Sequence, residues 1–508
     1  MTAPQRRGRA ARQAAPVARQ VNYRQLRNPF TPQVVFSEDE VAGLHATALR
    51  VLQELGIRIL LPEARKMLGA AGAIVDDDMV RIGSDMVAAA LATAPASIPM
   101  RAPNPARDQT YENGALIFSA AGGCPNVSDA TNGRRPGDLA SFTDAIKLVQ
   151  SFDVIHKMPI APEAQDIPIN LRHLETTLAQ LAYADKLLTV FARGTGQAEQ
   201  CFAMVQMGLN LSADAFAAAT WVSTVINSNS PRMLDVPMAQ GIIDFARAGQ
   251  MTIITPFCLA GAMAPVTVAG ALVLQHAEAL AGIVLAQVAK AGAPVSYGGF
   301  SSNVDMKSGA PAFGTPEHIK MQLGAGQLAR HIGLPWRSAA GSAGNTADPQ
   351  SVHENIMGLW GAMSAGATLT LHSAGWLEGG LTFGFEKFIC DIEAVQTLAE
   401  LCAPVDASAA GMAFDAIRGV DPGGHFFACP HTMERFDTAF YAPINADLST
   451  FGTWTANGAQ KAEDRAAEIV RQTLADYTQP AGCAEAAERV ARFVADTRKA
   501  GGAQPLTG

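Results

Sequence analysis

The feature that most constrains the fold is a regular alternation of strand and helix signals that begins near residue 114. Short apolar runs end in glycine, serine, asparagine or proline, and an amphipathic stretch of helical length follows each run. Strands that alternate with helices pair in parallel through crossovers. The candidate strands are residues 115–119, 154–160, 187–191, 220–226, 251–255, 294–297, 335–339 and 368–372. Eight such units, without a glycine-rich phosphate fingerprint after the first, favour a (β/α)8 TIM barrel over a doubly wound sheet.

The sequence on either side of this α/β alternation predicts three further parts. Ser37 and Glu40 form a capping box, in which each side chain can satisfy a free backbone amide of the other residue. Apolar residues then recur at helical spacing until Gly56, and the following sequence predicts further short helices. The predicted divisions are an arginine-rich flexible tail over 1–36, a helical N-terminal cap over 37–112, the catalytic barrel over 113–405, and a C-terminal loop with helices packed on the barrel over 406–508.

Composition excludes several classes of protein. Apolar residues make up 48% of the 508 residues and charged residues 17%, which argues against a disordered chain. The net charge of -8 combines seven arginines in an acid-free stretch of 30 residues with a remainder that carries 31 basic and 46 acidic residues. A chain with such an acidic body is unlike a nucleic-acid binder. The arginine-rich start could belong to a transit peptide, but we favour a flexible tail that lies over the acidic body.

Cysteine usage and hydropathy indicate the compartment. The seven cysteines are isolated from one another and odd in number, which is typical of a reducing cytoplasm and not of a disulfide framework. The longest apolar helix, near residues 266–288, is interrupted by Gln275, His276, Glu278 and Gln287. We therefore expect a cytoplasmic protein without a membrane-spanning segment.

Glycine and small polar residues follow most of the predicted strands, where a barrel carries its active site. The sequences concerned are residues 119–126, 192–195, 227–231, 298–302, 341–345 and 373–376. Such loops predict a wide mouth that lets a large planar ligand or a partner approach the backbone. No zinc-protease, nucleophile-elbow or phosphate-loop motif is present. Cys429 and His431 stand two residues apart, but without an evident third ligand we expect no metal site.

Two residues near the eighth predicted strand are the first catalytic candidates. His372 ends the apolar run 368–371, and Glu378 follows six residues later. A lone histidine in an apolar strand can be an ordinary core residue, so the position at the end of a barrel strand is what favours a functional role. Glu378 is its plausible partner.

The region around these residues resembles the trimethylamine methyltransferase family. The resemblance lies in residues 366–383, in Gly423-Gly424-His425-Phe426-Phe427 with Pro430-His431-Thr432, and in residues 52–57, and it extends over about residues 20–480. It implies a TIM barrel that moves a methyl group from a methylated amine to the cobalt of a corrinoid. It also implies that the corrinoid (cobalamin) is supplied by a separate small protein and not bound tightly by this chain, and that the chain forms a homo-oligomer.

One position departs from the family pattern. Members that demethylate trimethylamine carry pyrrolysine in a loop that the resemblance sets against residues 348–354, so Gln350 stands at or next to the pyrrolysine position. The chain is therefore similar to the branch without pyrrolysine, which includes glycine betaine methyltransferases. The catalytic residues predicted on this basis are Gln350, His372 and Glu378.

The chemistry of the methyl donor agrees with this departure. A quaternary ammonium leaves as a neutral tertiary amine, so it needs no covalent activator; it needs alignment with a nucleophilic cobalt(I) and exclusion of water. Aromatic faces usually hold such a cation, each contributing about 0.5–2 kcal/mol. The substrate-binding residues that we predict are Tyr297, Phe300, Phe383 and Trp376 for the cation, Arg193 and His372 (with Arg337 as a weaker choice) for a carboxylate, and Asn227, Asn229 and Gln350 for neutral hydrogen bonds. Phe257, Trp336 and Phe385 are further aromatic candidates.

Two alternatives remain open at this point. The enzyme could act on another methyl donor, either a sulfonium, which shares the cationic logic, or a methoxy compound, which would need electrophilic help such as a metal. The chain could also bind methylated amines without catalysis, because its acid–base inventory is small.

Overall fold

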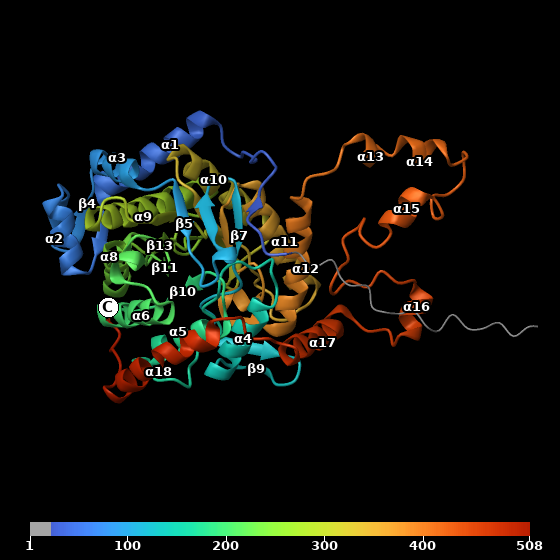
Figure 1. Cartoon of the computed structure of the whole chain (residues 1–508). Helices are drawn as coiled ribbons and strands as arrows, with labels where there is room; N and C mark the ends of the chain where they lie inside the picture. Colours follow the sequence, from blue (N-terminus) through green and yellow to red (C-terminus); the bar gives the residue numbers. More distant parts are fainter. Residues whose placement is uncertain (1–21, 508) are drawn as a thin grey trace, which may run out of the picture.

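A computed structural model describes residues 22–507 of the chain (Figure 1). Most of the arginine-rich tail therefore lies outside the described residues. Within its described part, Arg24 pairs with Glu400 at 3.0 Å and Arg27 pairs with Glu112 at 2.5 Å. Strand β1 (Leu26–Arg27) adds antiparallel to β7, so this end of the tail is attached to the body.

The centre of the molecule is an eight-stranded sheet in a mixed α/β fold. Its order is β1-β7-β19-β18-β15-β13-β11-β10, and every pair beyond β1 is parallel. The parallel strands are β7 (Ala115–Phe118), β10 (Leu188–Thr189), β11 (Val222–Ile226), β13 (Met251–Ile254), β15 (Val295–Gly298), β18 (Trp336–Ala339) and β19 (Leu369–Leu371). Each of these strands falls within one residue of a predicted strand, so the alternation identified the sheet correctly.

The second predicted strand, over residues 154–160, is the exception. Only Lys157 forms bridges there, in parallel with Ser119 after β7 and with Leu187 before β10. Pro159 interrupts the ladder, because proline has no backbone N–H to donate. The eight-stranded sheet is therefore curled, and its edge strands are β1 and β10. Of the predicted closed barrel, only this curled sheet in a mixed α/β fold is confirmed.

Helices pack around the sheet in the order that the alternation predicts (Figure 1). They are α4 (Leu139–Gln150), α5 (Arg172–Tyr183), α6 (Thr195–Gly208), α8 (Val236–Ala248), α9 (Val268–Ala289), α10 (Pro316–His331), α11 (Pro349–Ser364) and α12 (Phe385–Leu401). Helix α9 is long and apolar enough to cross a membrane by length and composition, but 78% of its most apolar window is buried inside the protein. It is therefore best described as a core helix that packs on α1, α3, α8 and α10.

The N-terminal segment is mixed and not purely helical, which corrects the predicted helical cap. The capping box at Ser37 is present and starts α1 (Glu38–Arg50), which continues into a π-helical turn (Val51–Leu55). Helices α2 (Pro62–Ala70) and α3 (Ser84–Thr93) follow as predicted. The strands that the prediction missed are β2 (Ile57–Ile59), β3 (Ile74–Asp76), β4 (Met79–Arg81), β5 (Ser97–Met100) and β6 (Gln109–Glu112). They span three or four residues each, too few for an alternation to stand out.

The C-terminal segment behaves in two ways. Helices α17 (Ala462–Ala475) and α18 (Cys483–Lys499) pack on the body, α17 against α12 and α18 against α5 and α6, as predicted. Residues 403–440, by contrast, leave the end of α12 and extend away from the body (Figure 1). The boundaries proposed at residues 112 and 405 stay predictions.

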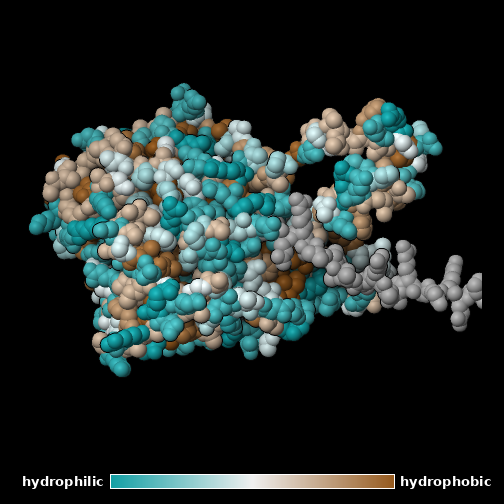
Figure 2. All heavy atoms as spheres, in the orientation of Figure 1, coloured by the Kyte–Doolittle hydropathy of each residue, from teal (hydrophilic) through white to brown (hydrophobic). Residues whose placement is uncertain are grey.

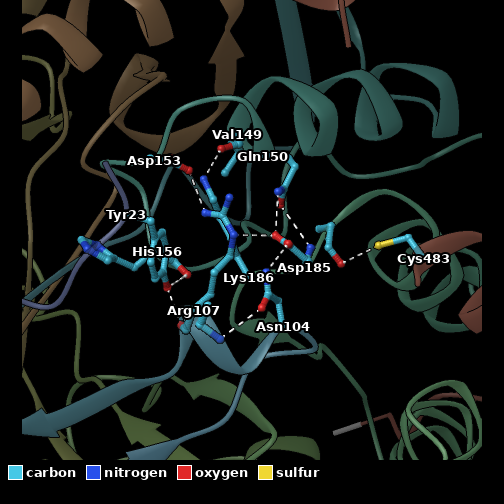
Figure 3. A network of polar contacts seen from close by, with 12 residues as sticks. Tyr23, Asn104, Arg107, Val149, Gln150, Asp153, His156, Asp185, Lys186 and Cys483 are labelled. Atoms are coloured by element: carbon cyan, nitrogen blue, oxygen red, sulfur yellow. Dashed lines mark hydrogen bonds and ion pairs between the residues drawn. The ribbon is translucent and has the colours of Figure 1, made fainter. Parts of the chain in front are cut away.

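A polar network fixes the end of the sheet at which the strands start (Figure 3). Arg107 pairs with Asp153 at 2.7 Å and with Asp185 at 2.8 Å. Asp185, which is 7% exposed, also accepts from Gln150 Nε2 at 2.7 Å. The Tyr23 hydroxyl donates to the carbonyl of Arg107 at 2.7 Å, so the network also holds the described start of the chain.

Replacing Asp185 with alanine tests the weight of this network. In this variant the Arg107 guanidinium, which is largely buried, keeps Asp153 but loses Asp185 as a partner. We expect the loss to lower the free energy of unfolding by about 3 kcal/mol. Urea denaturation followed by circular dichroism measures the effect. Glu54→Ala, which breaks an exposed pair with Arg50, is the control and should show no measurable change. An Asp185→Ala midpoint equal to the control's would show that the network contributes little.

Candidate functional site

The main cavity opens at the carboxyl ends of the parallel strands. Its volume is about 610 Å³, within the range of ordinary ligand pockets. Residues at or after the strand ends supply its inner lining, namely Ser119, Lys157, Thr189, Val225, Asn227, Phe257, Phe300, Arg337, Leu371, His372 and Trp376. We call this cavity the mouth pocket. It lies where a parallel α/β sheet carries its ligand, as the sequence predicted.

Arg337, on β18, is a cation with no carboxylate partner among residues 22–507. Its side chain is fully buried, and burial lowers its pKa to about 9. Its Nη2 lies 3.2 Å from His372 Nε2, and its guanidinium carbon lies 5.1 Å from the centre of the Phe300 ring. Its Nε and Nη1 atoms have no hydrogen-bond partner among the described residues. Because an unpaired buried donor is costly, these N–H groups are arranged for an acceptor that enters the pocket.

His372 stands at the end of β19 with the backbone in a left-handed conformation, at φ +55°. Its Nδ1 accepts from the backbone N–H of Gly122 at 3.2 Å, and its Nε2 faces Arg337. Burial, together with the Arg337 charge, keeps its pKa well below the ordinary value. A neutral imidazole has one donor and one acceptor nitrogen, so in a given tautomer only one of these two N–H groups can donate to His372. The ring lies between the Arg337 guanidinium and the loop at Gly122.

Trp376, in β20 (Trp376–Leu377), occupies a slot that only glycine permits. A Cβ at Gly341 would lie 2.9 Å from Trp376 Cδ1, and a Cβ at Gly380 would also meet the indole. Both glycines have positive φ, at +123° and +108°. The Trp376 Nε1–H is buried and has no acceptor among the described residues.

Aromatic rings form one wall of the pocket around Phe300. Its ring centre lies 5.1 Å from that of Phe257, 5.3 Å from that of His372 and 5.9 Å from that of Trp376. Phe313 stacks behind it at 5.3 Å and so fixes the ring from outside the pocket. The wall offers ring faces and edges to a ligand while its own position is set by packing.

Lys157 is a second buried cation in the pocket lining. It comes from the irregular second segment of the sheet, is 1% exposed, and donates to the Thr189 hydroxyl. Burial, and to a smaller degree the charge of Arg337, lowers its pKa to about 7. Its charge therefore changes near neutral pH, unlike that of Arg337.

Two carboxylates outside the pocket hold its loops. Asp391 accepts from the Gly375 N–H at 2.9 Å and pairs with the buried Lys387, so it fixes the turn before Trp376. Glu354 accepts from the Ser342 hydroxyl and the Ala343 N–H, both at 2.8 Å, and so fixes the loop after β18. These contacts keep the Trp376 slot in place.

The C-terminal residues hold the rim. The backbone N–H of Leu506 donates to the Arg193 carbonyl at 2.8 Å, and the Leu506 side chain packs over Gly194. Gln197 joins the same segments, since it accepts from the Arg193 N–H at 3.0 Å and donates to the Ala503 carbonyl at 3.0 Å. The loop that carries Phe191 and Arg193 is therefore attached to the end of the chain.

The structure brings seven of the predicted site residues to the pocket. They are His372, Phe300, Trp376, Arg193 and Asn227, together with the weaker candidates Phe257 and Arg337. These residues come from different loops and strands, which agrees with a site assembled by the sheet and not by one motif.

Five predicted residues lie elsewhere. Tyr297 points outward, with its hydroxyl 3.0 Å from His276 Nδ1 on α9, because successive strand residues face opposite sides. Phe383 is buried against Phe385 and Phe388. Asn229 bonds to Asp235, at 3.2 Å. The other two lie near the surface: Gln350 is exposed and donates to Glu354 at 2.8 Å, and Glu378 pairs with Arg134 at 2.8 Å beside the pocket rim.

Lys157 was missed by sequence reasoning, and Arg337 was ranked too low. Both are cations inside predicted apolar strands, and a charge in such a place is the signal that could have found them. Among residues 22–507, no group of three or more His, Cys, Asp or Glu residues is arranged to hold a metal ion. Cys429 and His431 lie outside the pocket, at the start of α15 (Pro430–Arg435).

Comparison with known proteins places the chain among methyltransferases. The sequence profile described as "Trimethylamine methyltransferase (MTTB)" matches residues 4–503. A glycine betaine methyltransferase of Desulfitobacterium hafniense (strain Y51) is 32% identical over 467 residues, which cover 92% of this chain and 97% of that protein. The trimethylamine methyltransferase MttB of D. hafniense (strain DSM 10664 / DCB-2) is 27% identical and covers 87% of this chain and 90% of its own length. Among solved structures, the Methanosarcina barkeri monomethylamine methyltransferase (MtmB) aligns with a TM-score of 0.49 at 10% identity, over 88% of this chain and 89% of its own.

Proposed function

The chain belongs to the trimethylamine methyltransferase family and is a methyltransferase, and on this premise we propose that its methyl donor is a quaternary amine that carries a carboxylate, as in a betaine. The acceptor that we propose is cobalt(I) of a corrinoid held by a small partner protein. The relative with 32% identity, which is named for glycine betaine, supports this substrate class.

The buried, unpaired Arg337 is the observation that carries the proposal. A simple methylated amine is itself a cation or a neutral base, and it would leave the Nε–H and Nη1–H of Arg337 without an acceptor. A carboxylate accepts charge-assisted N–H bonds from a guanidinium, so it can serve as the acceptor that these N–H groups lack. A zwitterionic substrate thus satisfies donors that the protein leaves free.

The same arrangement orients the substrate. With its carboxylate against Arg337, the quaternary nitrogen of a betaine points away from the guanidinium and toward the mouth. The Phe300, Phe257 and Trp376 rings then lie beside the cation, and each ring face contributes about 0.5–2 kcal/mol to its binding. The methyl groups face the opening of the pocket, where an acceptor can approach.

The residues of the chain align the donor and exclude water; they do not act as acids or bases. The leaving group is a neutral tertiary amine, so no proton has to be delivered, which agrees with the low pKa of His372. Holding the C–N bond in line with the acceptor is the main contribution of the protein. Expelling water from the pocket further strengthens the contact with Arg337.

The corrinoid supplies the strongly nucleophilic metal centre that takes the methyl group. The mouth fits such a partner, because its rim carries the partly exposed apolar side chains of Ile169, Phe191 and Leu381. An opening lined by these side chains and by Gly122, Gly123 and Gly379 lets a flat macrocycle approach the backbone. We propose further that the sheet acts as a closed barrel, with the Lys157 bridges in place of the second strand.

We also propose that the reaction proceeds without pyrrolysine. Gln350 lies on the surface with its amide on Glu354, outside the pocket lining, and a quaternary donor needs no covalent adduct. All seven cysteines are free thiols, which supports a cytoplasmic location.

A donor panel tests the proposed function. Purified protein is mixed with its corrinoid partner reduced to cobalt(I) and with glycine betaine, choline, trimethylamine, dimethylsulfoniopropionate or a methoxyaryl carboxylate, and methylcobalt is followed by absorbance. We expect fast methylation only from donors that have both a cationic methyl centre and a carboxylate. A preference for trimethylamine or for the methoxy compound would contradict the proposal. A preference for dimethylsulfoniopropionate would replace the quaternary amine by a sulfonium as the methyl donor and would keep the requirement for a cation and a carboxylate.

The pKa of Lys157 predicts a pH dependence of substrate binding. Below a pH of about 7 Lys157 is protonated and adds a second cation for the carboxylate; above it the ammonium loses its proton and this contribution is lost. The dissociation constant for a betaine should therefore rise with pH above 7, by up to about tenfold per unit. Titration calorimetry between about pH 6 and pH 8, roughly one unit either side of that pKa and below the pKa of about 9 of Arg337, measures it. Lys157→Met should bind more weakly at low pH and show a flat profile; an unchanged slope in this variant would contradict the assignment.

A further inference from the structure

Residues 403–440 form an arm without a core of its own. The arm contains only the short helices α13 (Ala409–Met412), α14 (Phe414–Arg418) and α15, and none of its residues is buried. Among the described residues, its hydrogen bonds run within the arm or to Glu400 at its root. Figure 1 shows it standing away from the body on the side of α12.

The side chains of the arm are unlike those of a solvated linker. Among residues 22–507, nine of the 25 large hydrophobic residues that are exposed lie on the arm, and these are Val405, Met412, Phe414, Ile417, Phe426, Phe427, Met433, Phe436 and Phe440. Phe427 is 81% exposed and Phe440 is 86% exposed. Figure 2 shows apolar side chains along this projection. A segment with so much unburied aromatic surface is typical of a binding surface.

The amount of apolar surface is that of a stable interface. A phenylalanine side chain buries about 150–250 Å² when it is covered. The five phenylalanines of the arm, with its methionines and aliphatic residues, therefore offer an area of the order of the roughly 800 Å² that each partner buries in a standard interface.

A second, smaller apolar patch lies beside the root of the arm. Ile356 and Trp360, one turn apart on α11, are each 42% exposed, and Phe30 and Leu401 are 44% and 47% exposed. Contacts between Asn28 Nδ2 and the Met363 carbonyl (2.8 Å) and between Cys402 Sγ and Met363 Sδ (3.9 Å) bring these segments together at one place. We call these four residues the flank patch.

The arm starts away from the mouth pocket of its own chain. It leaves the body after Leu401, at the C-terminal end of α12, and no residue of the arm lines the pocket. The N-terminal end of α12, at Phe385, follows β21 (Thr382–Gly384), which pairs with the strand that carries Trp376. A helix of 17 residues separates the two ends by about 25 Å. The chain returns at Tyr441 and Asn445, which are anchored on Glu393 in the middle of α12.

The charge of the arm excludes an anionic membrane. It carries five acidic residues and only two basic ones, Arg418 and Arg435, whereas membrane surfaces attract basic segments.

We propose that the arm is an exchange arm that packs on the flank patch of a second copy of this chain. The arm starts next to the flank patch of its own chain. A two-fold axis close to this point therefore makes the exchange reciprocal, because the arm of each copy then packs on the flank patch of the other. The assembly leaves both mouth pockets open. The proposal does not rest on the proposed methyl transfer.

Paired variants test the exchange by the mass of the full-length protein. One variant is Phe427→Asp with Phe440→Asp in the arm, and the other is Trp360→Glu in the flank patch. The control is Ile74→Asp, which replaces an apolar residue on β3 that is 63% exposed and lies outside the arm and the flank patch. Light scattering after size exclusion should give an even multiple of the chain mass of 53.2 kDa for the wild type and the control.

Each variant alone should dissociate, with a dissociation constant at least about a hundredfold larger, because burial of one phenylalanine changes an equilibrium roughly tenfold or more. An equimolar mixture of the two variants should regain the dimer. In each mixed pair, the unchanged arm of the Trp360→Glu variant can pack on the unchanged flank patch of the arm variant. A wild type at the mass of one chain, an arm variant that stays assembled, or a mixture that stays dissociated would each overturn the proposal. Circular dichroism separates dissociation from unfolding.

Discussion

Arg337 is a guanidinium buried among aromatic rings without a carboxylate, and the site is organised around it. Removing an ion of this kind from water costs several kcal/mol even after relaxation, so the surrounding structure must hold it in place. Phe300 lies against one face of it and His372 faces one edge, while the remaining N–H groups are left for an occupant. The glycine slot around Trp376, the left-handed backbone of His372 and the Asp391 brace all serve to fix this surrounding. Burial of Arg337 lowers the stability of the fold, and its free N–H groups offer a defined position for an anionic group.

The sheet was predictable because its signals are local and repeated. Most parallel strands show an apolar run followed by glycine or small polar residues, and such a pattern can be recognised without knowledge of tertiary contacts. The short N-terminal strands have no such run, and the second strand contains Pro159, so both needed the structure. Hydrophobic periodicity does not locate domain boundaries either, because the helices on both sides of a boundary show the same sequence pattern.

The site was predictable only to the level of its loops. The strand-end positions placed His372, Phe300 and Trp376 at one end of the sheet, where they line the mouth pocket, because direction along a parallel sheet determines which ends meet. Their roles stay predictions. Which way a side chain points is a different question, and Tyr297, one residue from the end of its strand, faces α9 and not the pocket. The two buried cations show the remaining difficulty. Lys157 and Arg337 interrupt apolar strands, but only packing reveals that the Nε and Nη1 atoms of Arg337 have no hydrogen-bond partner among the described residues. In the same way, an assignment of Gln350 by resemblance alone cannot show that its side chain lies at the surface on Glu354.

The central claim is that Arg337 selects a methyl donor with a carboxylate, and titration calorimetry with glycine betaine and choline tests it most directly. Both ligands have the same trimethylammonium group, and only betaine has the carboxylate. The wild type should bind betaine at least about a hundredfold more tightly than choline, as expected for a buried charge-assisted pair worth about 3 kcal/mol or more. In Arg337→Met this preference should disappear while choline binding stays the same, and thermal unfolding should occur at an equal or higher temperature because an unpaired buried charge is gone. Equal affinity of the wild type for the two ligands, or an undiminished betaine preference in Arg337→Met, would contradict the account.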